Sequence, residues 1–172
     1  CTQDFPKYSY LGLSGMLVVK DHNFSSFYWN IKDHSKSWNE DVSNHIDVDW
    51  ANYDPKFFTV NGNSHPNINT DTEARITGSV GDTIIIYFVN TGSSIHPIHF
   101  HGYHVKIVNS SKFPNQVGWE KDSQGIYPFE TVVVELVPHQ PGEYPIHDHN
   151  LIATTGGNVY PFGMLSTILI QP

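Results

Sequence analysis

The seven residues Thr83-Ile84-Ile85-Ile86-Tyr87-Phe88-Val89 form the most apolar stretch of this 172-residue chain. Turn-forming residues stand on both sides of it, with Gly81-Asp82 before and Asn90-Thr91-Gly92 after. A short apolar run that is rich in β-branched and aromatic residues and bounded in this way is typical of a strand buried on both faces. We therefore expect residues 83–89 to form the central strand of a β-sheet.

Shorter runs of the same kind flank this strand, and turn residues end each of them. They are Lys56–Val60 before Asn61-Gly62, Glu73–Thr77 before Gly78, and Thr131–Val137 before Pro138. From about Ile46 onward, no helical period is sustained over a dozen residues. Strands at this spacing, with Gly, Pro and Asn between them, predict an all-β sandwich or barrel.

The composition restricts the classes of partner. Hydrophobic residues make up 38% of the chain, which is enough for a folded core. The formal net charge is −8 and Lys and Arg form no cluster, so neither a nucleic acid nor an anionic membrane surface is an expected partner. The apolar run around Leu165–Ile170 is far too short to span a bilayer.

The N-terminal part of the sequence differs from the rest. Leu11–Val19 has the pattern of a strand after a Gly-rich turn, whereas Asp21–Asn44 is polar and rich in Asn, Ser and Asp. We expect the polar segment to be a connector with one short strand around Phe27–Ile31. The chain is thus divided into residues 1–20 as an N-terminal strand or extension, residues 21–45 as a connector, and residues 46–172 as one β-domain.

The chain contains eleven histidines, which is an unusually high number for its length, and five of them lie in two short clusters. The clusters are His96-Pro97-Ile98-His99-Phe100-His101-Gly102 and Gly142-Glu143-Tyr144-Pro145-Ile146-His147-Asp148-His149. Residues i and i+2 of a strand point to the same face, so each His-x-His presents two imidazoles side by side. A single pair of this kind is most often surface decoration. Two pairs on neighbouring strands would bring four imidazoles to one patch, which suits copper or zinc, with copper favoured by intrinsic affinity.

These motifs resemble those of the multicopper oxidase superfamily. His96-Pro97-x-His99-x-His101-Gly102 is similar to the family motif His-Pro-x-His-x-His-Gly, and Pro141-Gly142-Glu143-Tyr144-x-x-His147-x-His149 is similar to its partner motif. Phe58–Gly62 and Val80–Asn90 also resemble strands of that family, in the expected order. The resemblance covers residues 55–172 and implies a cupredoxin-like Greek-key β-sandwich with copper as its cofactor.

The resemblance also implies a role for each residue of the motifs. His99 would be a type 2 copper ligand, and His101, His147 and His149 would be ligands of the type 3 pair. His96 and Met164 would stand where a type 1 site has a histidine and its weak axial methionine.

Two departures from the family pattern remove the blue-copper site. Asp148 occupies the position of the copper cysteine, and Asn150–Thr155 contains no second type 1 histidine. A blue-copper site needs a thiolate and two imidazoles. The pocket of His96, Asp148 and Met164 could hold a hard or borderline ion weakly, or Asp148 could be a buried acid hydrogen-bonded to His96. Both alternatives are open at the level of the sequence.

The resemblance implies a partner, because a trinuclear copper cluster lies between two cupredoxin domains and uses four His-x-His pairs. The missing pairs would come from another domain or subunit, in a homo-oligomer such as a trimer or in a larger multidomain protein. Leu11–Val19 resembles the closing strand of a preceding cupredoxin-like domain. Cys1 would then be a copper cysteine of that domain, a lipoprotein-type cysteine or an ordinary thiol. The other six histidines are expected to be surface or structural residues: His22, His34, His45, His65, His104 and His139.

Three functions are compatible with these residues. The first is half of a type 2/type 3 trinuclear copper site in an oxidase-type oxidoreductase, which acts with a partner domain. The second is a copper-binding module without turnover, and the third is a degenerate structural or adhesion domain. An extracellular or periplasmic location is expected, where the Asn-x-Ser sequons at Asn23 and Asn109 would matter in a eukaryotic secretory pathway.

Overall fold

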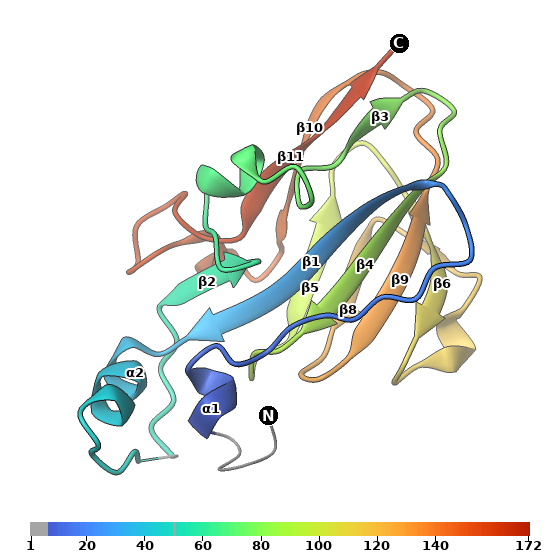
Figure 1. Cartoon of the computed structure of the whole chain (residues 1–172). Helices are drawn as coiled ribbons and strands as arrows, with labels where there is room; N and C mark the ends of the chain where they lie inside the picture. The colour runs from blue at the N-terminus through green and yellow to red at the C-terminus, as the bar shows by residue number, and fades with distance from the viewer. Residues whose placement is uncertain (1–6, 50) are drawn as a thin grey trace.

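The computed structural model describes residues 7–49 and 51–172, and in this part of the chain the strands form a two-layer sandwich (Figure 1). The six-stranded sheet has the order β2 (Phe57–Val60), β1 (Ser25–His34), β4 (Ile84–Asn90), β9 (Thr131–Leu136), β6 (Val105–Ser110) and β7 (Glu120–Lys121). The five-stranded sheet has the order β3 (Thr77–Ser79), β11 (Leu165–Gln171), β10 (Gly142–Asp148), β5 (His96–Phe100) and β8 (Ser123–Ile126). The predicted all-β sandwich is confirmed.

The apolar stretch at residues 83–89 forms β4, which lies inside the six-stranded sheet as expected. It pairs in parallel with β1 and antiparallel with β9. Every residue of β4 except Tyr87 is buried, as expected for a strand that is covered on both faces.

An aromatic chain connects the two sheets through the core. Trp29 of β1 packs edge-to-face on Phe88 of β4, with ring centroids 5.7 Å apart, and donates from Nε1 to the Ala74 carbonyl at 2.7 Å. Phe88 in turn packs edge-to-face on Phe100 of β5 at 6.4 Å. Since Phe100 lies between His99 and His101, this packing fixes the strand that carries the first histidine pair.

The strand expected around Phe27–Ile31 is present but longer than predicted. β1 spans Ser25–His34 and lies between β2 and β4, and α2 (Lys36–Ser43) follows it and buries Trp38 and Val42. The sandwich therefore includes residues that the sequence pattern indicated as a connector. The physical reason is a period of two in β1, in which every second residue from Phe27 onward is buried.

Residues 11–19, which have the pattern of a strand, do not form one in the structure. The short helix α1 (Lys7–Tyr10) ends in a turn at Leu11 and Gly12, and Figure 1 shows the blue trace that follows running beside β1 before it turns into that strand. Side chains rather than a backbone ladder hold it: Ser14 Oγ donates to Thr91 Oγ1 at 3.2 Å, and Lys20 Nζ donates to the Tyr28 hydroxyl at 2.9 Å. Cys1 lies outside the described residues.

Three short 3₁₀ helices complete the fold: η1 (Asn67–Thr70), η2 (Pro114–Gln116) and η3 (Leu151–Thr154). Of these, η3 follows directly on the second histidine pair. None of the helices in the described residues has the length and apolar character that crossing a bilayer requires.

Candidate metal centre

The two histidine clusters lie on adjacent strands. β5 and β10 pair antiparallel, and their register places His147 directly opposite His99. On the other side of β5, His99 lies opposite Ser123 of β8. The predicted neighbourhood of the two strands is confirmed.

The alternation of the strands separates ligand-type residues from core residues. His99 and His147 are half-buried and point to the outer face of the five-stranded sheet, while Ile98, Phe100 and Asp148 on the same strands are fully buried. His101 follows β5 and His149 follows β10, so both pairs are displayed on one face.

The four imidazoles form a close group. The centroid of His99 lies 4.7 Å from that of His101, 5.8 Å from that of His147 and 5.4 Å from that of His149. The centroids of His101 and His147 are 5.0 Å apart, with 2.9 Å between their Nε2 atoms, so one of these nitrogens donates to the other. Each ring thus lies close enough to a second imidazole for the two rings to bind one shared ion.

Backbone carbonyls determine which nitrogen faces outward in two of the four rings. His99 Nδ1 lies 3.0 Å from the Asp122 carbonyl and 2.8 Å from Ser123 Oγ, and His147 Nδ1 lies 2.8 Å from the Asp148 carbonyl. A carbonyl oxygen only accepts, so each Nδ1 carries the proton and each Nε2 keeps its lone pair. This anchoring of one ring nitrogen is the usual support of a metal-binding histidine.

The charge state of His101 also suits a metal. Burial lowers the pKa of His101, and the neighbouring imidazoles of His99, His147 and His149 lower it further. The neutral imidazole that results is the form that coordinates metal ions.

The group is not a finished site for a single ion. Among residues 7–49 and 51–172, no three His, Cys, Asp or Glu side chains converge in the geometry that holds one metal. The rings instead line an outer face on which His149 is exposed. Such an arrangement supplies imidazole donors and leaves the rest of a coordination sphere to other groups.

A second cluster lies on the inner side of the same strands. His96, Asp148 and Met164 are fully buried, and His96 Nδ1 lies 2.5 Å from Asp148 Oδ2. Asp148 Oδ1 accepts from the Asn150 amide at 2.8 Å. Of the two alternatives that the sequence left open for Asp148, the geometry supports the buried acid that is hydrogen-bonded to His96.

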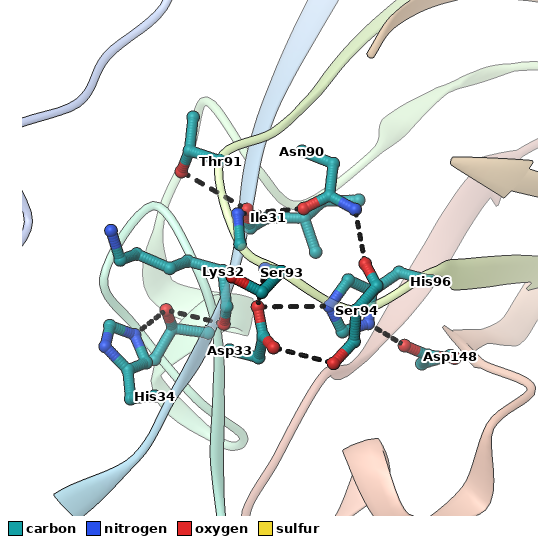
Figure 2. A network of polar contacts seen from close by, with 12 residues as sticks. Ile31, Lys32, Asp33, His34, Asn90, Thr91, Ser93, Ser94, His96 and Asp148 are labelled. Atoms are coloured by element: carbon teal, nitrogen blue, oxygen red, sulfur yellow. Dashed lines mark hydrogen bonds and ion pairs between the residues drawn. The ribbon is translucent and has the colours of Figure 1, made fainter. Parts of the chain in front are cut away.

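Asp33 of β1 is a fourth member of this inner cluster, and the sequence pattern did not reveal it. Figure 2 shows its carboxylate beside Ser94 and the His96 ring, with Asp33 Oδ1 3.8 Å from His96 Nε2. Three other donors hold the carboxylate: the Ser93 amide, Ser94 Oγ and the Tyr53 hydroxyl, each at 2.7 Å. The available signal was the alternation of β1, which directs Asp33 to the same inner face as Trp29 and Ile31.

The inner cluster is charged. Burial lowers the pKa of His96, but its contacts with Asp148 and Asp33 outweigh burial and raise the pKa to about 9. Burial raises the pKa of Asp33, but the contact with His96 and the bonds from Ser94 and Tyr53 outweigh it and hold the pKa well below its usual range. An imidazolium is therefore enclosed by carboxylates in the core.

The sequence profile of one protein family, described as multicopper oxidase, matches residues 37–162, which is well over half of the chain. The chain belongs to the multicopper oxidase family. Copper is the cofactor of this family, as the histidine motifs indicated, and the predicted cupredoxin-like sandwich is confirmed by the solved structures that it resembles.

The relatives of this multicopper oxidase chain are larger proteins. Hephaestin from Mus musculus is 24% identical over 138 residues, which are 78% of this chain and 11% of hephaestin. A blue copper oxidase from Nitrosomonas europaea superposes with a TM-score of 0.73 at 26% identity, over 84% of this chain and 43% of that chain. The multicopper oxidase mgLAC gives a TM-score of 0.72 at 20% identity, over 85% of this chain and 44% of its own. The chain thus spans less than half the length of each.

The residues of this multicopper oxidase chain do not fit a blue copper ion in the inner cluster. Among the residues that the structure describes, the pocket contains one imidazole and no thiolate, whereas a blue site needs two imidazoles and a thiolate. Moreover, His96 Nδ1 and Asp148 Oδ2 are in direct contact at 2.5 Å, which leaves no space for an ion between them. No electron-transfer step is therefore assigned to this pocket.

Three of the histidines that were expected to be surface or structural residues contact a hydroxyl group or an aromatic ring. His22 Nε2 bonds with the Tyr87 hydroxyl at 2.8 Å, and His34 Nε2 bonds with Thr59 Oγ1 at 2.9 Å. His139 packs edge-to-face on Tyr103 with ring centroids 5.8 Å apart.

Proposed function

We propose that this domain supplies half of the histidine ligands of a type 2/type 3 trinuclear copper centre. His99 would be a type 2 ligand, and His101, His147 and His149 would be type 3 ligands. The observation that carries the proposal is the cross-strand pair His99–His147, in which both Nδ1 atoms donate to backbone carbonyls, so that in both rings Nε2 is the nitrogen that carries the lone pair. In the metal-free chain the Nε2 of His147 accepts a hydrogen bond from His101, which an ion bound there would replace.

A copper cluster bound at this face would supply the redox chemistry of a multicopper oxidase. The residues of the chain hold and orient the ligands: the Asp122 and Asp148 carbonyls fix the rings of His99 and His147. Phe100, buried between the first two histidines, anchors their strand in the core.

The remaining ligands would come from a second cupredoxin domain or subunit, in a homo-oligomer or a larger multidomain protein. Two features support this: the four imidazoles face outward without completing a site in the described chain, and the matched part of this chain covers only 43% and 44% of the two solved relatives. Electrons would have to enter from a type 1 copper in the partner, because the inner cluster here offers no thiolate. Size-exclusion chromatography with light scattering on copper-loaded protein tests this, since a copper-saturated monomer without a second domain would contradict it.

The location proposed for this function is extracellular or periplasmic. Asn23 and Asn109 of the two sequons are both exposed, so a secretory pathway with glycosylation enzymes could modify them. Fractionation of the native cells tests the location, and recovery of the protein in the cytoplasm alone would contradict it.

Copper titration of the full-length protein tests the proposed site. The wild type and the matched variant His104→Ala, an exposed histidine three residues beyond the first pair, should bind copper, show a type 2 paramagnetic signal and develop a near-ultraviolet band of a hydroxide-bridged pair. His99→Ala and His147→Ala should lose both signals and oxygen consumption. Equal copper binding by all four proteins would overturn the proposal.

A copper-binding module without turnover is the second candidate. It is favoured by the His101–His147 pair, whose Nε2 atoms are 2.9 Å apart within one chain. This candidate predicts a simple type 2 signal without the near-ultraviolet band and without oxygen consumption in the full-length protein. The same titration therefore separates the two functions.

A further inference from the structure

The strands that carry the outer histidines also carry the inner ion cluster. His96 lies on β5 three residues before His99, and Asp148 lies on β10 between His147 and His149. Alternation directs His96 and Asp148 into the core and the histidine pairs to the outer face. A contact between His96 and Asp148 therefore acts on the same backbone segments that place the ligands.

We propose that Asp33, His96 and Asp148 form a positioning triad that fixes the geometry of the four outer imidazoles. The proposal rests on the proposed function, since it assigns the triad to the copper site that the outer histidines would form. In this family the same pocket can hold a metal; here an ion cluster of the chain's own side chains ties the strands together.

Four atoms of Asp148 are hydrogen-bonded, and two of them connect the triad to the outer face. Its Oδ2 meets His96 Nδ1 at 2.5 Å, and its Oδ1 accepts from the Asn150 amide at 2.8 Å, directly after His149. Its carbonyl accepts from His147 Nδ1 at 2.8 Å, and its amide donates to the Met164 carbonyl at 3.2 Å. A shift of Asp148 would therefore rotate the His147 ring and displace the backbone beside His149.

Asp33 connects the triad to the opposite sheet. It lies on β1 of the six-stranded sheet, while His96 and Asp148 belong to the five-stranded sheet. Asp33 accepts hydrogen bonds from Ser93, Ser94 and Tyr53, and these bonds fix the orientation of the carboxylate that faces His96. Asn90 supports the same loop, because its Nδ2 donates to the Ser94 carbonyl at 2.8 Å.

Burial explains why such a triad acts as a determinant of geometry. All three side chains are fully buried, and buried charges are tolerated only when they are paired. His96 is hydrogen-bonded to Asp148 through Nδ1, whereas its Nε2 faces Asp33 Oδ1 at 3.8 Å as an ion pair and has no hydrogen-bond partner in the described residues. If His96 were displaced, the carboxylates of Asp33 and Asp148 would each lose their positively charged partner. The core therefore allows only one arrangement of these strands, and this arrangement also fixes the positions of the outer imidazoles.

The test compares Asp148→Asn and Asp33→Asn with Glu130→Gln. Glu130 is a matched control, since it is equally buried and its carboxylate is held by Ser110 Oγ and the Tyr127 amide, away from the histidines. The probe is Cu²⁺ alone, added to the full-length protein; the readouts are its dissociation constant, the paramagnetic spectrum and the melting temperature in chelator.

All three variants should melt below the wild type, but only the two triad variants should bind Cu²⁺ more weakly, by roughly 10-fold or more, with a changed spectrum. Wild-type affinity and spectrum in both triad variants would overturn the positioning role and leave the proposed function intact. A wild type that binds no Cu²⁺ would overturn the proposed function itself. Should either triad variant fail to fold, Ser94→Ala removes one donor to Asp33 and should weaken Cu²⁺ binding in the same direction; unchanged affinity there would also overturn the inference.

Discussion

His99 and His147 lie directly opposite each other on β5 and β10, and their ring centroids are 5.8 Å apart. Each ring donates through Nδ1 to a carbonyl of the chain, so in both rings Nε2 is the nitrogen that carries the lone pair. The opposite faces of the same strands bury Ile98, Phe100 and Asp148. The copper-ligand face and the core are thus two sides of one strand pair, and changes in the core should be detectable at the ligands.

The stability of the metal-free protein should fall at alkaline pH because of His96. Its pKa in the folded state is raised to about 9, above the ordinary value of 6.5 that applies to the unfolded chain. Its contribution is therefore complete below pH 6.5 and is lost as the pH rises toward 9, with a size on the order of 3 kcal/mol. Urea unfolding in chelator between pH 6 and 10 measures it; an Asp148→Asn variant should show a smaller decrease, and a wild-type curve that is flat across this range would contradict the assignment.

The substitution Gly92→Ala should disrupt the anchoring of Asp33. A Cβ atom at Gly92 would lie 1.7 Å from Asp33 Oδ1 and 2.9 Å from the Asp33 backbone nitrogen, so β1 or the loop must move. Overpacking of this kind costs about 3 kcal/mol or more in the free energy of unfolding. Gly15→Ala is the matched control, because nothing lies within 4 Å of a Cβ there. Equal stability of the two variants in chemical denaturation would show that Asp33 is not held as described.

The substitution Phe100→Ala should affect both stability and the metal face. Phe100 is 1% exposed and packs on Phe88, so its removal should cost about 3–5 kcal/mol in the free energy of unfolding. Phe162, which is 48% exposed, is the matched control, and Phe162→Ala should cost much less. Under conditions where both variants remain folded, Phe100→Ala should also weaken copper binding; similar stability for the two variants would contradict the placement of Phe100.

Restoring a cysteine should not restore a blue-copper site. Asp148→Cys would supply the thiolate, but the pocket would still contain His96 as its only imidazole. The variant should also be less stable, because His96 and Asp33 lose their partner. Visible absorption of the copper-loaded variant is the measurement, and an intense blue band would show that another imidazole reaches this pocket.

The central strand and the histidine face were predictable because their signals are local. The apolar run at Thr83–Val89 specifies a buried strand by itself, and the two His-x-His motifs specify their own faces by alternation. The pairing of β5 with β10 came from the resemblance of both motifs to one family, and the register His99–His147 agrees with it.

The errors concern features that depend on partners far away in the chain. β1 pairs in parallel with β4, which lies about sixty residues later in the chain. The polar residues of β1 make the buried positions Phe27, Trp29 and Ile31 hard to recognise in the sequence. Asp33 could be recognised as part of a site only once β1 and His96 are placed together. Conversely, Leu11–Val19 has a strand-like pattern, but Leu17 is 93% exposed and no strand pairs with this segment in the part of the chain that the structure describes.

X-ray absorption at the copper edge of the loaded full-length protein tests the central claim most directly. We expect imidazole nitrogens in the first coordination shell of the copper, and a clear loss of imidazole scattering when His99 and His147 are both replaced by alanine. An unchanged imidazole shell in the double variant would contradict the proposed site.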